Sequence, residues 1–415
     1  MVNTKMRELA NSFSGISALT LATLVAGAAL AGPKEVSGPG ADPACFAPRD
    51  AKVKYLQYPG KKGPLRVALV NGYVGNTWRI QMVQTAKAYV EQPDVKPDVA
   101  EFKVVSVGED VAAQIGAIDQ FINAGYDAIV MIANNSTSYG PAMDRAAAAN
   151  VVVVPFDVVV DSDKVILVNE SQTEIGNLAG KYLLSHMPEK SGKILEVRGI
   201  AGTSVDQDRS AGFHAAMDAG GKWEYVEVRG KWDEGITQKV AADAIAVHGH
   251  FAGAYVQDGT PGLVRALIET KHGFIPVAGQ AENGFKKMCV QYKDQGLTCA
   301  SAGQVPSLVA IALKAAISAA KGNVMPQFIS APIPYSDTET LKAGVNYFPD
   351  LPDSFYTNNE FPACKINIGA KEITAQTKAK AGDAQGGHGN SAVAAVWAAD
   401  KIVRWRRRTL CRSGG

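Results

Sequence analysis

The sequence predicts an α/β protein made of two lobes, each containing a doubly wound parallel sheet with helices on both faces. Three observations lead to this prediction. Short, continuously apolar segments alternate with segments of helical periodicity, as a parallel sheet buried on both faces requires. The alternation breaks off and restarts near the middle of the chain. With 415 residues, the chain is long enough for two domains of about 150 residues each.

The first lobe is expected over residues 64–169 and 305–328. Its strands are short apolar runs, and the segments between them carry apolar residues at helical spacing. The expected strands are 66–70, 102–107, 128–132 and 151–156, and the expected helices are 78–90, 111–124, 141–150 and, after the second lobe, 305–320.

The second lobe is expected over residues 170–304 and 329–370, where the alternation resumes. The expected strands are 193–197, 225–228, 254–256, 276–278 and 365–368, and the expected helices are 178–186, 212–219, 236–247 and 262–270. Two such units in series predict a cleft between the lobes. Ligands of open parallel sheets bind beyond the carboxyl ends of the strands, so the residues that follow each strand are the candidates for a site.

The two ends of the chain lie outside this pattern. In residues 1–31, Lys5 and Arg7 precede an uncharged apolar run that ends in small residues, which is typical of a signal peptide. The run is shorter than the roughly twenty residues that span a membrane, so we expect export, with a buried N-terminal helix as the alternative. Residues 32–63 are rich in Pro, Gly and Lys and are expected to form an extended lead-in. Residues 371–415 are expected to form a mobile tail.

The composition argues against several classes of partner. A net charge of +2 and 20% charged residues give no basic field for nucleic acid or a membrane surface. No C-x-x-C or paired-histidine pattern accompanies the cysteines, so we expect no metal site. We expect a soluble monomer that binds neither nucleic acid nor a cofactor.

Five cysteines follow the expected signal peptide, in a compartment where disulfides persist. Cys289 and Cys299 are ten residues apart, beside the end of a helix and the start of a strand, so we expect them to form a disulfide. A pair between Cys45 and Cys364 is a second hypothesis, and Cys411 is left over.

Candidate ligand-binding residues follow two of the apolar runs. Asn76, Trp78 and Arg79 come after the first run, at the start of a helix, and Asp157 ends the fourth run. The first loop is not G-x-G-x-x-G, so it suits a dinucleotide poorly. An indole can instead stack on a sugar ring, and a carboxylate can accept hydrogen bonds from neighbouring hydroxyls. The alternatives are a core role for Trp78 and a structural role for Asp157.

A resemblance to a known family rests on the second lobe. Gly199-Ile-Ala-Gly-Thr-Ser204, followed by Asp208-Arg209-Ser-Ala-Gly212-Phe213, resembles the corresponding stretch of ribose-type periplasmic binding proteins. The similarity runs from about residue 65 to residue 320, with strands and helices in the same order. It implies a type I periplasmic binding protein fold, whose two lobes are joined by a multi-strand hinge. It also implies the substrate-binding component of an ABC transporter, a non-enzymatic protein of the periplasm that captures a small sugar or polyol and delivers it to a membrane permease.

The resemblance also implies site residues, and this sequence departs from the family at three of its positions. The positions that match the family's sugar-binding residues are Asn76, Trp78, Arg79, Asp157, Gln172, Arg209, Trp232, Asp258 and Gln304. Ribose binders have paired phenylalanines where Trp78 and Arg79 stand, and an arginine where Val158 stands. The acid expected after strand 276–278 is missing; the segment 279–283 replaces it, and we take Asn283 from it as a site residue. The bulkier indoles favour a pyranose or a larger polyol over ribose.

The predicted site is a sandwich between the lobes. Trp78 and Trp232 can cover the two faces of a ring, and polar side chains can bind the hydroxyls at its edge. A ligand that touches both lobes favours the closed form of the hinge. A sensor of the same fold, which presents its ligand for chemotaxis or signalling, is the alternative function. An α/β enzyme is less favoured, because the sequence has no G-x-S-x-G or H-E-x-x-H motif.

Overall fold

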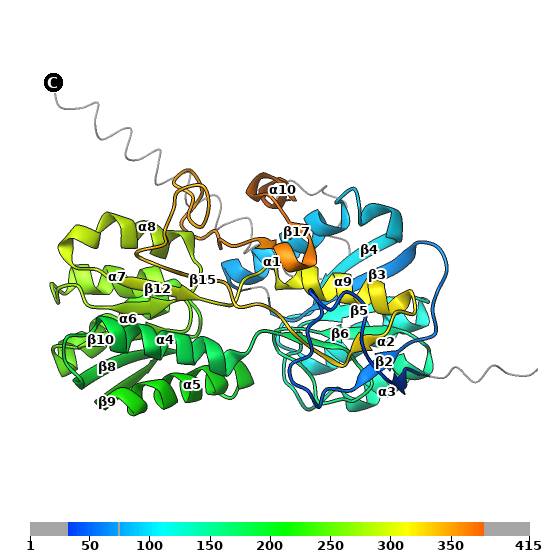
Figure 1. The fold of residues 1–415 in the computed structure, drawn as a ribbon, viewed down its shortest axis with the longest axis horizontal. Helices are drawn as coiled ribbons and strands as arrows, with labels where there is room; N and C mark the ends of the chain where they lie inside the picture. Colours follow the sequence, from blue (N-terminus) through cyan, green and yellow to red (C-terminus); the bar gives the residue numbers. More distant parts are fainter. Residues whose placement is uncertain (1–31, 74, 377–415) are drawn as a thin grey trace, which may run out of the picture.

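A computed structural model describes residues 32–73 and 75–376, which form two α/β lobes side by side (Figure 1). The expected signal peptide at residues 1–31, most of the expected tail and Cys411 lie outside the described residues. The fold predicted from the sequence, two lobes with parallel sheets and helices on both faces, is confirmed.

The first lobe has a parallel four-stranded sheet in the order β4-β3-β5-β6. Every residue of β5 and β6 is buried, as their uninterrupted apolar sequences require. Helices α1 and α9 pack together on one face of the sheet, and α2 and α3 pack on the other (Figure 1). The bounds are β3 (Leu65–Asn71), α1 (Thr77–Val90), β4 (Val99–Ser106), α2 (Val111–Asn123), β5 (Ala128–Met131), α3 (Gly140–Ala148), β6 (Val152–Pro155) and α9 (Leu308–Ala320).

The second lobe has a six-stranded sheet in the order β15-β12-β11-β10-β8-β9, parallel except for β15. Helices α4 and α5 pack on one face, and α6, α7 and α8 pack on the other. The bounds are α4 (Gln172–His186), β8 (Ser191–Arg198), α5 (Ser204–Gly220), β9 (Lys222–Arg229), α6 (Glu234–His248), β10 (Gly253–Val256), α7 (Thr260–Glu269), β11 (Val277–Gly279), α8 (Asn283–Gln291), β12 (Cys299–Ala302) and β15 (Tyr335–Asp337).

The lobes are joined by a hinge of several strands. Strands β7 (Leu167–Asn169) and β14 (Phe328–Ser330) run parallel to each other beside the first lobe. The chain passes between the lobes after β7, between β12 and α9, and between β14 and β15. Three passages at one place let the lobes rotate about a common axis while their strand ends face each other.

The expected lead-in is part of the first lobe. Strands β1 (Lys34–Val36) and β2 (Tyr55–Gln57) form a small antiparallel sheet with β13 (Met325–Pro326). Phe46 and Tyr58 are 2% exposed and belong to the same apolar core as the central strands. This segment therefore contributes to folding instead of merely extending from it.

The C-terminal part of the chain also differs from the expected boundaries. Strands β16 (Glu360–Phe361) and β17 (Ile366–Asn367) and helix α10 (Ala370–Ala375) lie on the first lobe, where α10 contacts α1. The expected boundary had assigned residues up to 370 to the second lobe and residues from 371 to a mobile tail. Ile373 is fully buried in the first lobe's core, and this burial favours helix α10 over a mobile chain.

Both disulfides considered from the sequence are formed. Cys289–Cys299 joins α8 to β12, which confirms the expected pair. Cys45–Cys364 connects the N-terminal segment to the C-terminal one, across 319 residues of sequence. Between residues 32 and 376, no helix is both long and apolar enough to cross a membrane.

Candidate ligand-binding site between the lobes

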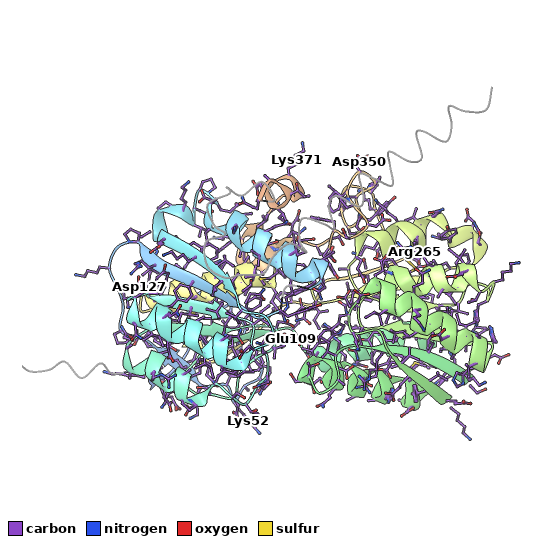
Figure 2. All side chains as sticks on the ribbon, turned by 180° about the vertical axis from the view of Figure 1, so that it is seen from behind. Lys52, Glu109, Asp127, Arg265, Asp350 and Lys371 are labelled. Atoms are coloured by element: carbon purple, nitrogen blue, oxygen red, sulfur yellow. A yellow bond between two sulfur atoms is a disulfide. The ribbon has the colours of Figure 1, made fainter. Side chains whose placement is uncertain are left out.

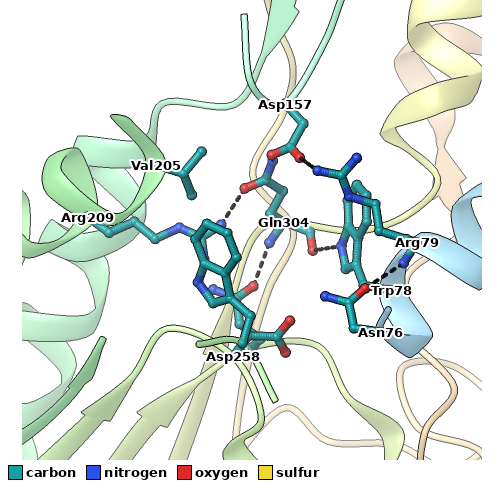
Figure 3. A pocket seen from close by; sticks show the side chains of 10 residues that line it. Asn76, Trp78, Arg79, Asp157, Val205, Arg209, Asp258 and Gln304 are labelled. Atoms are coloured by element: carbon teal, nitrogen blue, oxygen red, sulfur yellow. Dashed lines mark hydrogen bonds and ion pairs between the residues drawn. The ribbon is translucent and has the colours of Figure 1, made fainter. Parts of the chain in front are cut away.

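A pocket lies between the two lobes, at the carboxyl ends of both sheets (Figure 3). It encloses about 390 Å³ of space not filled by atoms, part of it open to solvent. The pocket is lined by Asn76, Trp78, Arg79, Asp157, Val205, Arg209, Trp232, Asp258, Gln280 and Gln304.

Helix α1 supplies the first lobe's wall. The side chain of Asn76 accepts a hydrogen bond from the Arg79 N–H at 2.9 Å and so caps the helix start. Trp78 is 7% exposed, and its Nε1 donates to the Gln304 carbonyl oxygen at 3.0 Å, which fixes the indole. The Arg79 guanidinium donates to Asn71 Oδ1 at 2.8 Å. Burial lowers the pKa of Arg79, and the nearby carboxylate of Asp157 opposes that shift.

Asp157 lies two residues after strand β6 and has a left-handed backbone conformation, with φ of 63°. Its carboxylate accepts a hydrogen bond from Gln304 Nε2 and lies 3.7 Å from the Arg79 guanidinium. Burial raises the pKa of Asp157, whereas Arg79 and Arg209 act to lower it. A buried carboxylate flanked by two cations can accept hydrogen bonds from ligand hydroxyls.

Arg209, on α5, forms the second lobe's cationic wall. Its guanidinium donates to Gln172 Oε1 at 2.8 Å, to the Gln257 carbonyl oxygen at 2.8 Å and to Gln304 Oε1. Arg209 is 3% exposed, and these three bonds pair its buried guanidinium and hold it in one position. Gln172 does not line the pocket; it orients Arg209 from behind.

Trp232 provides an indole from the second lobe. It lies in the turn between β9 and α6, where Lys231 and Trp232 have φ of 56° and 59°. Its ring lies against Gly199, where a Cβ atom would come within 2.1 Å of Trp232 Nε1. Only glycine fits at position 199 without displacing the indole.

Two donors on lining residues have no acceptor within the described part of the chain. They are Trp232 Nε1 and Gln280 Nε2, and both atoms are buried. A buried polar group without a partner costs about 1–3 kcal/mol. A ligand rich in hydroxyl oxygens would supply the missing acceptors.

A pair of buried carboxyl groups closes the second lobe's side of the pocket. Asp258 accepts hydrogen bonds from the Tyr356 hydroxyl at 2.9 and 3.0 Å, and Glu282 Oε1 accepts from the Gly259 and Thr260 amides at 2.8 and 2.9 Å. Burial raises the pKa of both carboxyl groups. The charge of Asp258 raises the pKa of Glu282 further, whereas Tyr356 and Glu282 hydrogen bonds lower that of Asp258. Within this pair, the pKa of Glu282 is therefore raised more strongly than that of Asp258.

Gln304 connects the two walls at the hinge. Its side chain bonds Arg209 of the second lobe and Asp157 of the first. Its backbone N–H donates to Gln280 Oε1 at 2.8 Å, and its carbonyl accepts from Trp78 (Figure 3). Gln304 is thus hydrogen-bonded to lining residues from both lobes.

Residues 67–323 match the model of the periplasmic binding protein domain. The chain belongs to this family. Its type I fold is shared by solved structures that cover about two thirds of the chain. A periplasmic solute binding protein of an ABC transporter from Actinobacillus succinogenes 130z, solved with bound D-allose, is 20% identical and has a TM-score of 0.57, covering 67% of this chain and 98% of that one. The binding protein of the arabinose ABC transporter from Shewanella sp. ANA-3, bound to L-arabinofuranose, is 21% identical and has a TM-score of 0.58, covering 66% of this chain and 92% of that one.

A curated relative of this periplasmic binding protein is also similar in sequence. The D-ribose/D-allose-binding protein of Pseudomonas aeruginosa is 30% identical over 179 residues, which are 40% of this chain and 54% of that protein. The chain spans about half or less of the length of the curated relatives it matches. The descriptions of these relatives name ribose, allose or galactofuranose as what they bind or import.

Eight of the ten residues expected at the site line the pocket, and two do not. The two exceptions are Gln172 and Asn283. The Asn283 side-chain amide donates to the Phe348 carbonyl at 2.8 Å and accepts from the Phe348 N–H at 2.8 Å. Asn283 therefore holds a surface segment against α8. Val205 and Gln280 also line the pocket and were not predicted from the sequence. Gln280 could have been found, because it follows β11 directly and side chains after a strand point to the site.

A larger opening lies beside the hinge strands β7 and β14, with about 1,300 Å³ of unfilled space including open solvent. Its lining is mostly short polar and acidic side chains. Its one aromatic ring, Phe328, is covered by the Arg49 guanidinium at 4.3 Å. It has no indole, whereas the smaller pocket has one from each lobe, so the smaller pocket is the better candidate for a sugar site.

One group in the described ranges has the geometry to hold a metal ion. Glu196, His214 and Glu227 each offer a ligand atom within 4.8 Å of the others, on β8, α5 and β9 of the second lobe. His214 Nε2 is hydrogen-bonded to Glu196 at 2.7 Å, and Arg198 pairs with Glu227 at 2.7 Å. Protein partners thus occupy these groups, and the absence of a metal site stays a prediction.

Proposed function

We propose that this protein captures a single monosaccharide or a polyol in the interlobe pocket and delivers it to an ABC permease in the periplasm. The observation that supports the proposal most is the make-up of the pocket. Indoles come from both lobes, and charged groups and unpaired donors surround them. Relatives and structural neighbours are described as binding ribose, allose or arabinofuranose.

The proposed binding mode separates the faces of the sugar from its edge. Trp78 and Trp232 cover the apolar C–H faces, which gains about 25 cal/mol for each Å² of apolar surface removed from water. The hydroxyls at the edge donate to Asp157 and Asp258 and accept from Arg79 and from the unpaired donors. An analogue without one of these hydroxyls would leave a buried partner unpaired, so the pocket would reject it.

The ligand also sets the hinge. Because its contacts come from both lobes, it has higher affinity for the closed form and shifts the population toward that form. The permease would recognise the closed shape. The pocket would release its ligand unchanged, so we propose a receptor and not an enzyme.

The test is a thermal-shift and calorimetry screen of the mature protein against D-ribose, D-allose, L-arabinose, D-galactose and sorbitol. A ligand of the folded state must raise the melting temperature, by an amount that grows with concentration. Analysis of the recovered sugar should show no turnover. Trp78→Ala and Trp232→Ala should both weaken the tightest ligand strongly while far-ultraviolet circular dichroism stays unchanged. The proposal is wrong if no sugar or polyol binds, or if both tryptophan variants bind as the wild type does.

A further inference from the structure

The chain crosses between the lobes a fourth time, apart from the hinge. After β15 it continues over α8 of the second lobe and then passes to the first lobe, where β16, β17 and α10 lie. Figure 2 shows Asp350 above the second lobe and Lys371 above the first. This crossing, residues 352–359, lies beyond the region 67–323 that matches the family.

The crossing is attached to the second lobe beside the pocket. The Thr357 N–H donates to the Ala281 carbonyl at 2.9 Å, and the Asn283 N–H donates to the Phe355 carbonyl at 2.7 Å. Lys286 Nζ donates to Thr357 Oγ1 at 2.8 Å. These partners belong to α8 or directly precede it, next to the lining residue Gln280.

The same few residues are attached to the first lobe. Gln81, on α1, donates through Nε2 to the Tyr356 carbonyl at 2.8 Å and accepts from the Tyr356 N–H at 2.8 Å. The Ser307 hydroxyl, at the start of α9, donates to the Asn358 carbonyl at 3.0 Å. Farther along, the disulfide of Cys364 fixes the chain to the first lobe.

Tyr356 is the point at which the two sets of contacts meet. Its backbone is held by Gln81, on the helix that also carries Trp78 and Arg79, and its hydroxyl donates to both oxygens of Asp258. A chain of hydrogen bonds therefore runs from the first lobe's wall of the pocket to the second lobe's carboxylate without passing through the hinge. Tyr356 is 4% exposed, so these bonds are shielded from water.

We propose that Tyr356 is a positioning residue of the interlobe site and that the crossing at residues 352–359 couples the two walls of the pocket. The inference rests on the proposed function, and it assigns to this segment a role in ligand retention. For the lobes to separate, either the Gln81 pair or the Asp258 bonds must break. The crossing therefore favours the closed form and slows ligand release.

The first test does not depend on the identity of the ligand. Hydrogen–deuterium exchange of the ligand-free protein is measured on a peptide that covers residues 353–359, in the wild type, Tyr356→Phe and Gln81→Leu. Loss of either link should speed exchange at Thr357 by about tenfold or more, because the segment opens more often. Tyr347→Phe is the matched control: this tyrosine lies in the same C-terminal segment, the Asp258 hydrogen bonds come from Tyr356 instead, and exchange should stay unchanged. Equal exchange in all four proteins would show that the crossing does not couple the lobes.

The second test uses the tightest binder among D-ribose, D-allose, L-arabinose, D-galactose and sorbitol. Tyr356→Phe should weaken it by about tenfold, mainly through faster dissociation, whereas Tyr347→Phe should not. A merely structural tyrosine would leave the pH profile of affinity in place. The groups that face Asp258 are Arg209, Glu282 and Tyr356. Because the Tyr356 hydrogen bond lowers the pKa of Asp258, removing the hydroxyl should raise that pKa. The loss of affinity on acidification should then occur at higher pH. Unchanged affinity and an unmoved profile would overturn the positioning role.

The two proposals fail differently. If the wild type binds none of the five probes, the proposed sugar function is wrong and the positioning role falls with it, while the exchange experiment still decides whether the crossing couples the lobes. If the wild type binds a probe and Tyr356→Phe binds it equally well with the same pH profile, only the inference is wrong.

Discussion

Gly199→Ala should move the Trp232 indole and thereby report whether this ring touches the ligand. A Cβ at position 199 would lie 2.1, 2.2 and 2.5 Å from Nε1, Cε2 and Cζ2 of Trp232. Carbon atoms pack at about 3.5–4.0 Å, so the ring must shift by roughly 1.4 Å or more. The ring is only partly buried and sits in a turn, so it can swing outward without unfolding the lobe.

The expected loss of affinity follows from the contact area. A buried aromatic side chain covers about 150–250 Å², and one face of the ring roughly a third of that, or about 50–80 Å². At about 25 cal/mol per Å², losing that face costs about 1.3–2 kcal/mol. Affinity should therefore fall about tenfold to thirtyfold.

Isothermal titration calorimetry with the tightest sugar of the panel measures this effect. Gly116→Ala is the matched control, because a Cβ there meets no atom within 4 Å on helix α2; it should leave affinity unchanged and stabilise the protein by up to about 1 kcal/mol. The double variant Gly199→Ala/Trp232→Ala should bind no more weakly than Trp232→Ala alone, since both changes act on one contact. Additive losses, or an affinity of Gly199→Ala within twofold of the wild type, would refute the reasoning.

Three further outcomes are expected. Asp157→Asn should weaken sugar binding more than tenfold in calorimetry, or about 1.4 kcal/mol, because the amide replaces an acceptor oxygen with a donor; binding within twofold of the wild type would place the pocket's acceptor elsewhere. Burial raises the pKa of Glu170 to about 8, so the folded state holds a proton that the unfolded chain releases above about pH 4.5. That contribution to stability is complete below about pH 4.5 and is lost as pH rises toward 8; Glu170→Gln should reduce the fall in melting temperature between pH 5 and pH 8, and an unchanged fall would contradict the assignment. Removing the Cys289–Cys299 disulfide with Cys289→Ser/Cys299→Ser should lower the free energy of unfolding by about 2–3 kcal/mol, because the bond closes a short loop. Denaturant titration measures this difference, with the wild type under reductant as the control. Equal unfolding midpoints for the oxidised wild type and the variant would contradict the prediction.

The architecture was predictable because its signals are local. The central strands are uninterrupted apolar runs, and side chains such as Asp110, Ser171 and Asp233 cap the helices that follow strands or turns. The C-terminal segment has no such signal. Ile366 and Ile373 are buried against strands and helices some 300 residues earlier in the sequence, and nothing in their neighbourhood shows that partner.

The site was predictable where a polar residue lies within two residues of the end of a strand. Asp157 and Asp258 come after β6 and β10, and the structure brings both to the pocket. Asn283 was taken from the segment 279–283, whereas it is Gln280 of that segment, directly after β11, that lines the pocket. Tyr356 was out of reach for a different reason. Its position depends on a long irregular segment whose path is set by pairs such as Gln81–Tyr356, which only the folded chain creates.

Two kinds of unfavourable local feature occur at or beside the interlobe pocket. Asp157, Lys231 and Trp232 have left-handed backbone conformations, and Trp232 Nε1 and Gln280 Nε2 are buried donors without acceptors in the described ranges. Each such feature destabilises the ligand-free protein by an amount of order 1–3 kcal/mol. If the proposed function is correct, hydroxyl oxygens of the ligand would accept hydrogen bonds from the two unpaired donors, and these bonds would add to the free energy of binding.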